Sequence, residues 1–462
     1  MTKKKVLEGS SLFIIFVAIT YSFITNGFGV APWNEWAVWE QGSEVMVLKR
    51  IEVDLLDRNV SNLGLANYEG DELTVIERLS PENIASLKDS APATFDPYES
   101  EIGGQAHFWS FIWRDLGCSS ISCLHAVNSA LSAAAVLAIY FVFSMIGARG
   151  LGVAWLISAA ASPWIAFGAR NLFWSPWLYF LPAVAAVGLV LARSNRKRTV
   201  AISGLFVAFI TKFIMTGYHE ITAFVMLAAA IPVIAILFKK GNSVDVRLQL
   251  RNTLIVVATA ALSFVLVISI HAQMLTGNIP TGLKQIWINT VLRRSYGRPE
   301  DFDSSYADSL TSNPLAVLWR YIWSDWWTDL LSFSLNKGGS VFSVSLGSMS
   351  FVILSILGVL VVLIRLLNKD PYWIRDAGLL VMGFAIPALW LMGAKAYANN
   401  HTHILFFLWY WLYVPALLFV ITTFIWNYQR QIRSTLGFPS GLRIHIDSGT
   451  ELDLDGHKTG SK

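Results

Sequence analysis

The sequence predicts an all-α polytopic membrane protein with about ten transmembrane helices. Of its 462 residues, 54% are hydrophobic and only 14% are charged, which is too apolar for a soluble globular protein to hide in its core. Apolar stretches of spanning length recur along the chain, and basic residues gather in alternate connections between them. Two long polar stretches interrupt the series, and this pattern places both on the same side of the membrane.

Each predicted span has close to the 20 mainly apolar residues that a membrane helix requires. The three lysines before the first stretch could also begin a cleaved secretory signal, but no clear cleavage site follows, so we expect this stretch to remain as the first span. Residues 1–426 form the predicted membrane domain, and residues 427–462 form a cytoplasmic tail with too few apolar residues to pack, expected to be largely disordered. The apolar stretches cover residues 10–30, 125–147, 150–168, 172–192, 199–218, 220–238, 253–271, 347–365, 377–394 and 404–426.

The basic residues of the short connections predict the orientation. Only Arg170 and Lys395 fall in the short connections of one side, whereas clusters such as residues 3–5, 193–198 and 239–251 fall on the other. Because Lys and Arg are enriched in cytoplasmic loops, both termini are predicted to be cytoplasmic. The short connections favour a bacterial inner membrane over the endoplasmic reticulum.

Two large outer loops are therefore expected at residues 31–124 and 272–346. Both are rich in Trp, Tyr, Asp and Glu, and both contain amphipathic stretches, at residues 108–116 and 315–331. Aromatic residues are frequent where membrane meets water, so we expect these stretches to be helices on the membrane surface rather than parts of a detached domain.

Cys118 and Cys123 are the only cysteines. If the predicted orientation holds, both lie outside the cytoplasm, where a small disulfide loop persists. Two free thiols are the alternative, and neither reading leaves cysteines for a metal site of the usual spacing.

Several function classes find no support in the sequence. The net charge of +4 is scattered in short clusters rather than gathered in one patch, so no nucleic-acid partner is expected. We find no phosphate-cradling Walker loop, no dinucleotide glycine fingerprint and no serine-centred elbow. ATP hydrolysis, NAD chemistry and serine hydrolysis are therefore not predicted.

Two acidic segments of the first outer loop carry candidate chemistry. The first reads Trp33-Asn34-Glu35-Trp36, directly after the first span, and the second reads Phe95-Asp96-Pro97-Tyr98-Glu99-Ser100-Glu101-Ile102-Gly103-Gly104-Gln105. Pro97 holds the residue before it extended, and the two glycines let the backbone approach a ligand closely. The alternatives are an interfacial helix start and an ordinary Asp-Pro turn.

Ionisable residues also gather toward the outer ends of the predicted helices. Such residues are costly in a membrane and suggest function, although snorkelling and hydrogen-bonded histidines are the competing explanation. In the second outer loop, Arg293, Arg294 and Arg298 precede an acidic patch, where they either grip a phosphate or form a solvated ion-pair surface. The residues at the helix ends are Arg170, Lys212, His219, Glu220, His271, Lys395, His401 and His403.

The order of these parts resembles the GT-C superfamily of integral membrane glycosyltransferases, from the first span to about residue 346. That resemblance implies inverting transfer of a sugar from a polyprenyl-phosphate donor to a glycan, lipid or protein acceptor at the outer face, in cell-envelope or lipopolysaccharide biogenesis. The superfamily often has an Asp-Glu pair after the first helix, and here Asn34 replaces the first acid. Glu35 or Asp96 is then the catalytic base.

The resemblance also assigns substrate contacts, to Glu99, Glu101, Gln105, Arg170, His219, Glu220, Arg294, Arg298 and His401. No cofactor is certain. A divalent cation is left open, since Asp96, Glu99 and Glu101 can supply oxygen ligands and members of the superfamily differ in metal use.

Two other functions remain open. An O-antigen-type polymerase or ligase has a similar size and relies on arginines of the outer loops, so Arg294 and Arg298 would matter more than Glu35. A transporter or flippase of lipid-linked sugars would have broken or charged helices at the bilayer midplane and an internal repeat, which we do not find in the sequence.

Overall fold

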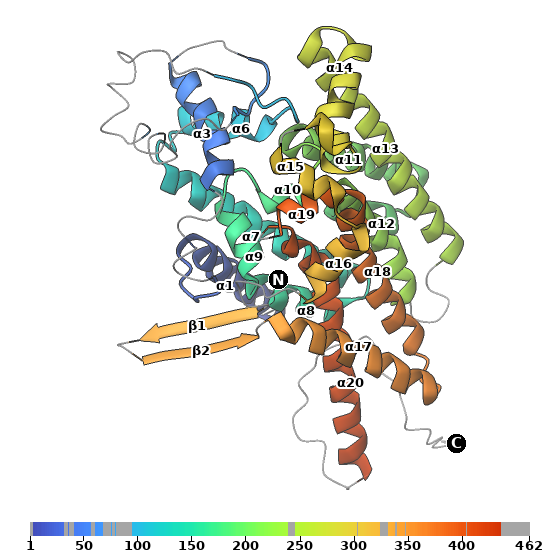
Figure 1. Ribbon diagram of the computed structural model, residues 1–462. Coiled ribbons are helices and arrows are strands. Elements are labelled where there is room, and N and C mark those ends of the chain that lie inside the picture. Colours follow the sequence, from blue (N-terminus) through green and yellow to red (C-terminus); the bar gives the residue numbers. More distant parts are fainter. Residues whose placement is uncertain are drawn as a thin grey trace.

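The protein is a bundle of helices with one small β-hairpin (Figure 1). The computed structural model describes residues 3–31, 36, 41–56, 61–67, 75, 79, 95–238, 245–302, 304–323, 331–337, 340–346, 348–402 and 404–435. Glu35 and His403 lie outside these described residues, as do residues 436–462 of the predicted tail. The predicted start of that tail at residue 427 was wrong, because residues 427–435 continue a helix that ends at Thr435.

The helices follow one another with short connections, except in the two predicted loops. The first half contains α1 (Lys3–Thr25), α3 (Gln41–Leu55), α6 (Gly104–Arg114), α7 (Ile121–Met145), α8 (Arg149–Ala160), α9 (Pro163–Arg170), α10 (Pro176–Leu191), α11 (Asn195–Thr216) and α12 (Ile221–Leu237). The second half contains α13 (Val246–Thr276), α14 (Ile279–Ile286), the π-helix η1 (Trp287–Leu292), the 3₁₀ helix η2 (Pro299–Asp301), α15 (Ser304–Thr311), α16 (Pro314–Trp323), β1 (Leu331–Lys337), β2 (Ser340–Leu346), α17 (Ser348–Leu367), α18 (Trp373–Gly393), α19 (Lys395–Asn400), the 3₁₀ helix η3 (Leu405–Trp411) and α20 (Tyr413–Thr435).

Polar residues at the helix starts explain several of these boundaries. Ser120, Ser162 and Ser194 each accept a hydrogen bond from the backbone N–H three residues later, at the starts of α7, α9 and α11. Asp245 does the same for α13. Such caps satisfy N–H groups that the helix itself leaves unpaired, which fixes where an apolar run begins to coil.

Every predicted apolar stretch overlaps a helix or a pair of helices. Four described helices are long and apolar enough to cross a membrane: α7, α11, α13 and α18. The count rises to six if two bent pairs, α8 with α9 and η3 with α20, are each taken as one span. The described helices thus fit an all-α membrane protein, and the count of ten spans stays a prediction.

Breaks and prolines interrupt several of the apolar helices. The α8–α9 pair bends by 67° and the η3–α20 pair by 41°. Pro182, Pro232 and Pro387 lie inside α10, α12 and α18. Proline removes a backbone hydrogen bond and kinks a helix, so these helices are less regular than their hydropathy alone predicts.

The hairpin β1–β2 was not predicted. It pairs Leu331 with Leu346 and Lys337 with Ser340 in antiparallel register. Its sequence alternates apolar and polar residues on both sides of Gly338-Gly339, which is a recognised hairpin signal. The expectation of one amphipathic helix over residues 315–331 was therefore wrong, since α16 ends at Trp323 and a strand begins at Leu331.

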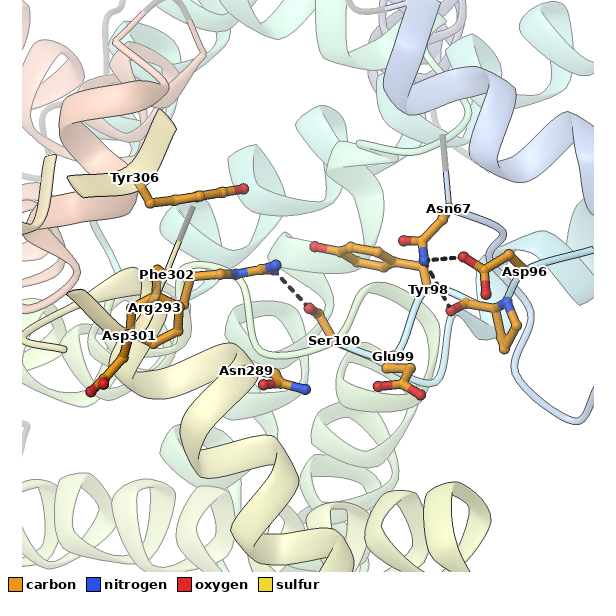
Figure 2. A pocket seen from close by; sticks show the side chains of 11 residues that line it. Asn67, Asp96, Tyr98, Glu99, Ser100, Asn289, Arg293, Asp301, Phe302 and Tyr306 are labelled. Atoms are coloured by element: carbon orange, nitrogen blue, oxygen red, sulfur yellow. Dashed lines mark hydrogen bonds between the residues drawn. The ribbon is translucent and has the colours of Figure 1, made fainter. Parts of the chain in front are cut away.

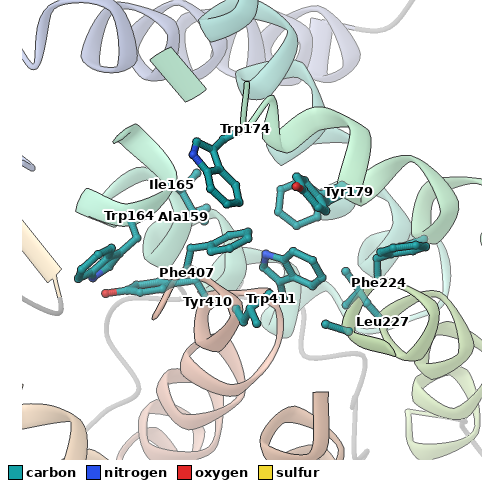
Figure 3. Packing of buried hydrophobic residues seen from close by; sticks show 14 of the residues in the cluster. Ala159, Trp164, Ile165, Trp174, Tyr179, Phe224, Leu227, Phe407, Tyr410 and Trp411 are labelled. Atoms are coloured by element: carbon teal, nitrogen blue, oxygen red, sulfur yellow. The ribbon is translucent and has the colours of Figure 1, made fainter. Parts of the chain in front are cut away.

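An aromatic core fills the space between α9, α10, α12 and η3 (Figure 3). Trp411 packs against Tyr179 and Phe180 with ring centroids 5.6 and 5.9 Å apart. Phe407 contacts Trp174 at 6.2 Å. Burial of such large side chains contributes about 2 kcal/mol each and fixes the connection that carries Trp174.

Cys118 and Cys123 form a disulfide, as one of the two sequence alternatives predicted. Their Cα atoms lie 5.6 Å apart, at the step from α6 to α7. The bond closes a short loop beside the cap of α7, so it holds the end of the first polar segment (residues 31–124) against that helix.

Candidate functional site

A polar pocket of about 300 Å³ lies between the first polar segment and the second polar segment (residues 272–346) (Figure 2). This volume is at the lower end of the range of small-molecule sites, roughly 300–1,000 Å³. The lining residues come from both segments: Asn67, Asp96, Pro97, Tyr98, Glu99, Ser100, Asn289, Arg293, Asp301, Phe302 and Tyr306.

Carboxylates line both sides of the pocket, Asp96 and Glu99 on the first segment and Asp301 on the second, and the guanidinium among the lining residues is that of Arg293 (Figure 2). On the side of the first segment, Asp96 is exposed and accepts a hydrogen bond of 2.7 Å from Asn67 Nδ2. On the opposite side, the guanidinium of Arg293 lies 5.2 Å from the centre of the Tyr306 ring. Tyr98 lies between them. A proton acceptor and a cation therefore face one small space.

A buried cluster lies directly behind this pocket. Glu101 and His219 have 0% and 3% of their surface exposed, and Arg294 has 6%. Nε2 of His219 is 3.4 Å from Oε1 of Glu101 and 3.4 Å from Nη2 of Arg294. Arg294 also donates a hydrogen bond of 3.1 Å to the hydroxyl of Tyr98, which connects the cluster to the pocket.

The turn between α11 and α12 carries His219 and Glu220 into this cluster. Lys212 donates hydrogen bonds to the carbonyls of Gly217 and His219, at 3.1 and 2.8 Å. Its ammonium also lies 4.3 Å from the centre of the Phe224 ring. Lys212 thus holds the turn, and these hydrogen bonds give a structural reason for one of the ionisable residues predicted at the helix ends.

Several polar atoms at the cluster are buried with no well-formed hydrogen bond in the described part of the chain: both amide atoms of Gln105 and Nδ1 of His219. The buried carboxylates of Glu101 and Glu220 have loose polar contacts, with Nε2 of His219 and with Tyr179 respectively. Most buried polar groups in proteins are hydrogen-bonded, and exceptions concentrate at functional sites. Glu220 also has a positive φ of 53°, which is uncommon for a residue other than glycine.

Burial and neighbouring charges shift the pKa values of this cluster. Burial, reinforced by Arg294, lowers the pKa of His219 to about 4, so this side chain is neutral at pH 7. Burial raises the pKa of Glu220 to about 7, and the charge of Lys212 only partly opposes this shift. Burial alone would raise the pKa of Glu101, but contacts with His219, Arg294 and Lys212 lower it. Because His219 is neutral at pH 7, Arg294 is the cation that keeps Glu101 ionised at this pH.

The two glycines at the end of the acidic segment serve packing within the chain. A Cβ on Gly104 would lie 2.9 Å from the carbonyl oxygen of Ile214 in α11. A Cβ on Gly103, whose φ is +72°, would lie 2.7 Å from the side chain of Leu65. Gly104 thus lets α6 sit against α11 and Gly103 lets it sit against Leu65, so packing within the chain accounts for both glycines, and a close approach to a ligand stays a prediction.

A second pair of buried glutamate and histidine provides a comparison. Oε1 of Glu44 on α3 accepts hydrogen bonds from Nε2 of His125, at 2.8 Å, and from the backbone N–H of Leu172, at 2.9 Å. This pair joins the first polar segment to α7 and to the α9–α10 turn. Because Glu44 has conventional partners and lines no described pocket, we interpret this pair as structural.

The other predicted substrate residues lie away from the pocket. Arg170 donates a hydrogen bond of 2.8 Å to the carbonyl of Trp36 and stacks over its ring. Arg298 is exposed and is not among the lining residues. His401 stacks on Tyr397 with centroids 4.1 Å apart, and Tyr397 in turn contacts the ring of His219 at 5.4 Å. These placements do not support direct contact with a ligand in the pocket.

Lys395 also has a structural position. Its ammonium donates hydrogen bonds of 2.8 Å to the carbonyls of Leu310 and Ser312, at the end of α15. Cations stabilise the C-terminal ends of helices, where carbonyls are left unpaired. Lys395 therefore fastens the second polar segment to α19.

The carboxylates considered as cation ligands point to separate partners. Asp96 accepts from Asn67, Glu99 accepts from Gln285 at 2.6 Å, and Glu101 faces His219. Within the described ranges, no group of three or more His, Cys, Asp or Glu side chains has a metal-binding arrangement.

Sequence reasoning missed the aromatic and amide residues of the site. Tyr98 stands within the acidic segment and joins the pocket to Arg294, while Tyr306 and Asn289 come from the second segment. The available signal was the arginine pair, but only the structure shows that Arg293 lines the pocket and Arg294 lies behind it. No protein family, no curated protein and no solved structure matches the chain.

Proposed function

We propose that the protein is a membrane glycosyltransferase that takes a sugar from a polyprenyl-phosphate donor and attaches it to a hydroxyl acceptor in the pocket. The observation that carries this proposal is the pairing of Asp96 on one side of the pocket with Arg293 on the other. The apolar helices that flank the polar segments fit a lipid-borne donor. The predicted bacterial inner membrane, with both termini cytoplasmic, places the pocket at the periplasmic face.

The proposed reaction is a single displacement with inversion at the anomeric carbon. Asp96 accepts the proton of the acceptor hydroxyl as its oxygen forms a bond to that carbon. The bond from the carbon to the phosphate oxygen breaks, and its electron pair stays on the phosphate. Arg293 is placed to stabilise the negative charge that grows there. Glu35 is the alternative base.

Asp96→Asn and Arg293→Met test this assignment in proteoliposomes that contain lipid-linked sugars. Loss of the base is expected to lower kcat roughly 10²–10⁴-fold, and loss of the guanidinium roughly 10²–10³-fold. New glycosidic bonds are measured by mass spectrometry. The matched controls are Asp115→Asn and Arg298→Met, both exposed and outside the pocket, which should stay within about threefold of the unchanged chain.

Glu35→Gln distinguishes the two candidate bases. If Asp96→Asn is fully active and Glu35→Gln is not, the base is Glu35 and the pocket contributes Arg293 alone. Full activity of both variants would remove the mechanism. A donor requirement for a pyrophosphate-linked oligosaccharide would instead favour the O-antigen-type polymerase or ligase.

A transporter of lipid-linked sugars is the second candidate, favoured by the broken helices. Three apolar helices contain proline and two helix pairs bend by 67° and 41°. Unwound or kinked segments of this kind occur at substrate sites of transporters. Movement of a labelled lipid-linked sugar across the bilayer without a new glycosidic bond would support this candidate against the first.

A further inference from the structure

Three hydrogen bonds join the two polar segments across the pocket. Arg294 donates to Tyr98 at 3.1 Å, Arg293 to the hydroxyl of Ser100 at 3.0 Å, and Gln285 to Glu99 at 2.6 Å. In each pair the donor belongs to the second segment and the acceptor to the first. The pocket therefore exists only while these two stretches, almost 200 residues apart in sequence, remain together.

Two of these contacts are linked to the buried cluster. Arg294, a member of the cluster, bonds to Tyr98, and the bonded pair Ser100 and Arg293 directly precedes Glu101 and Arg294 in the chain. Because neighbouring residues share a peptide bond, the packing that holds Glu101 and Arg294 also fixes where Ser100 and Arg293 begin. The cluster thus lies where both segments meet the α11–α12 turn.

His219 joins the two segments through one nitrogen atom. Its Nε2 lies 3.4 Å from a guanidinium nitrogen, which only donates, and 3.4 Å from a carboxylate oxygen, which only accepts. A neutral imidazole nitrogen either donates a hydrogen bond or accepts one, so Nε2 bonds to Glu101 or to Arg294 at any one time. A side chain that carries a separate donor and acceptor, such as glutamine, can bond to Glu101 and Arg294 together.

The segment before the arginines has an unusual backbone. Residues Trp287–Leu292 form a π-helix, and Thr290 within it is buried. Single π-helical turns are rare in proteins as a whole, but those that occur often lie at functional sites. Arg293 and Arg294 come directly after this π-helix. Consecutive residues of a helix project roughly 100° apart, so Arg293 lines the pocket while Arg294 points into the interior.

From these contacts we infer that Glu101, His219 and Arg294 are positioning residues, which lock the two polar segments together and thereby place Tyr98 and Arg293 in the pocket. Burial keeps all three from touching a ligand there. The assignment of catalysis to the pocket rests on the proposed function, whereas the locking itself does not.

A cysteine pair at Glu99 and Gln285 reports the locking without any activity measurement. The full-length Glu99→Cys, Gln285→Cys chain in nanodiscs is treated with a mild oxidant, and disulfide formation is followed by peptide mass spectrometry. Cys118 and Cys123 are already paired and do not compete. Adding His219→Leu or Arg294→Met is expected to slow the new disulfide at least about tenfold, because local opening separates the segments.

His219→Gln and His125→Leu are the matched variants. Glutamine supplies both an acceptor for Arg294 and a donor for Glu101. In the His219→Gln variant, the rate of disulfide formation should therefore stay within about threefold of the rate in the cysteine-pair chain that keeps His219. His125→Leu breaks the comparison pair of Glu44 and should lower Tm without slowing the disulfide. In the chain without added cysteines, His219→Leu should lower kcat roughly 10²-fold through misplacement of pocket groups, and His219→Gln should restore most of it.

The outcomes separate the two proposals. Unchanged disulfide rates in Arg294→Met and His219→Leu would overturn the locking, as would equal slowing by His125→Leu. If His219→Leu does not fold, Arg294→Met alone decides. Slowed disulfides as expected, with no sugar transfer by the unchanged chain on any donor, would leave the locking in place and reject the proposed function.

Discussion

Replacement of Gly217 by alanine is expected to abolish the arrangement of the buried cluster. Gly217 ends α11 with φ 60° and ψ −147°, a conformation that L residues rarely adopt. A Cβ there would lie 2.0 Å from Oε2 of Glu101. Backbone strain costs about 1–3 kcal/mol and overpacking a similar amount, so Gly217→Ala should be among the most destabilising single substitutions in the chain.

The measurement is the apparent Tm of the purified protein, together with the disulfide rate of the Glu99 and Gln285 cysteine pair. Gly277→Ala is the control: Gly277 also has a positive φ, of 68°, but its ψ of 2° is left-handed helical, and a Cβ added there would meet no described neighbour within 4 Å. This variant should lose only the smaller stability that a left-handed alanine costs. Equal losses of Tm in both variants would mean that the contact with Glu101 contributes nothing.

The stability of the protein is expected to change with pH in opposite directions when His219 or Glu220 is replaced by glutamine, one at a time. The pKa of His219 falls from 6.5 to about 4 on folding, and that of Glu220 rises from 4.5 to about 7. Between pH 4.5 and 6.5, rising pH therefore increases the stability contributed by His219 and decreases that contributed by Glu220. Each effect amounts to at most about 3 kcal/mol, and in the unchanged chain the two largely cancel.

His219→Gln leaves Glu220 uncompensated, so its apparent Tm should fall by several degrees as the pH rises through this window. Glu220→Gln leaves His219 uncompensated, and its Tm should rise over the same window. Scanning calorimetry or scattering-based melting at pH 4.5, 5.5 and 6.5 checks both slopes. Parallel slopes in the two variants would show that these residues do not titrate against each other.

The sequence predicted the helices better than the site. Each apolar stretch became a helix because bilayer-length apolar runs have few other ways to satisfy their backbone. The disulfide of Cys118 and Cys123 followed from proximity in the chain. The alternating pattern around Gly338-Gly339 was present but not recognised, so the hairpin was missed.

The candidate site was predicted only as a set of residue types. The acidic segment and the arginine pair were identified from the sequence. Which of their residues line the pocket and which lie buried behind it was not predicted. Adjacent residues share composition and position in a motif, so nothing in the sequence separates Arg293 from Arg294 or Ser100 from Glu101. The division comes from the surroundings that each side chain meets in the fold, the pocket for Ser100 and Arg293 and the turn that carries His219 for Glu101 and Arg294.

The sequence by itself determined where the chain is apolar and where it is polar, because these depend only on which residues follow one another. Only the tertiary structure decided that residues 96–101, the turn at 217–220 and residues 285–294 meet. Their meeting depends on helix packing, on close backbone contact at Gly217 and on the opposite charges of Glu101 and Arg294, and these act only when distant segments are already in place.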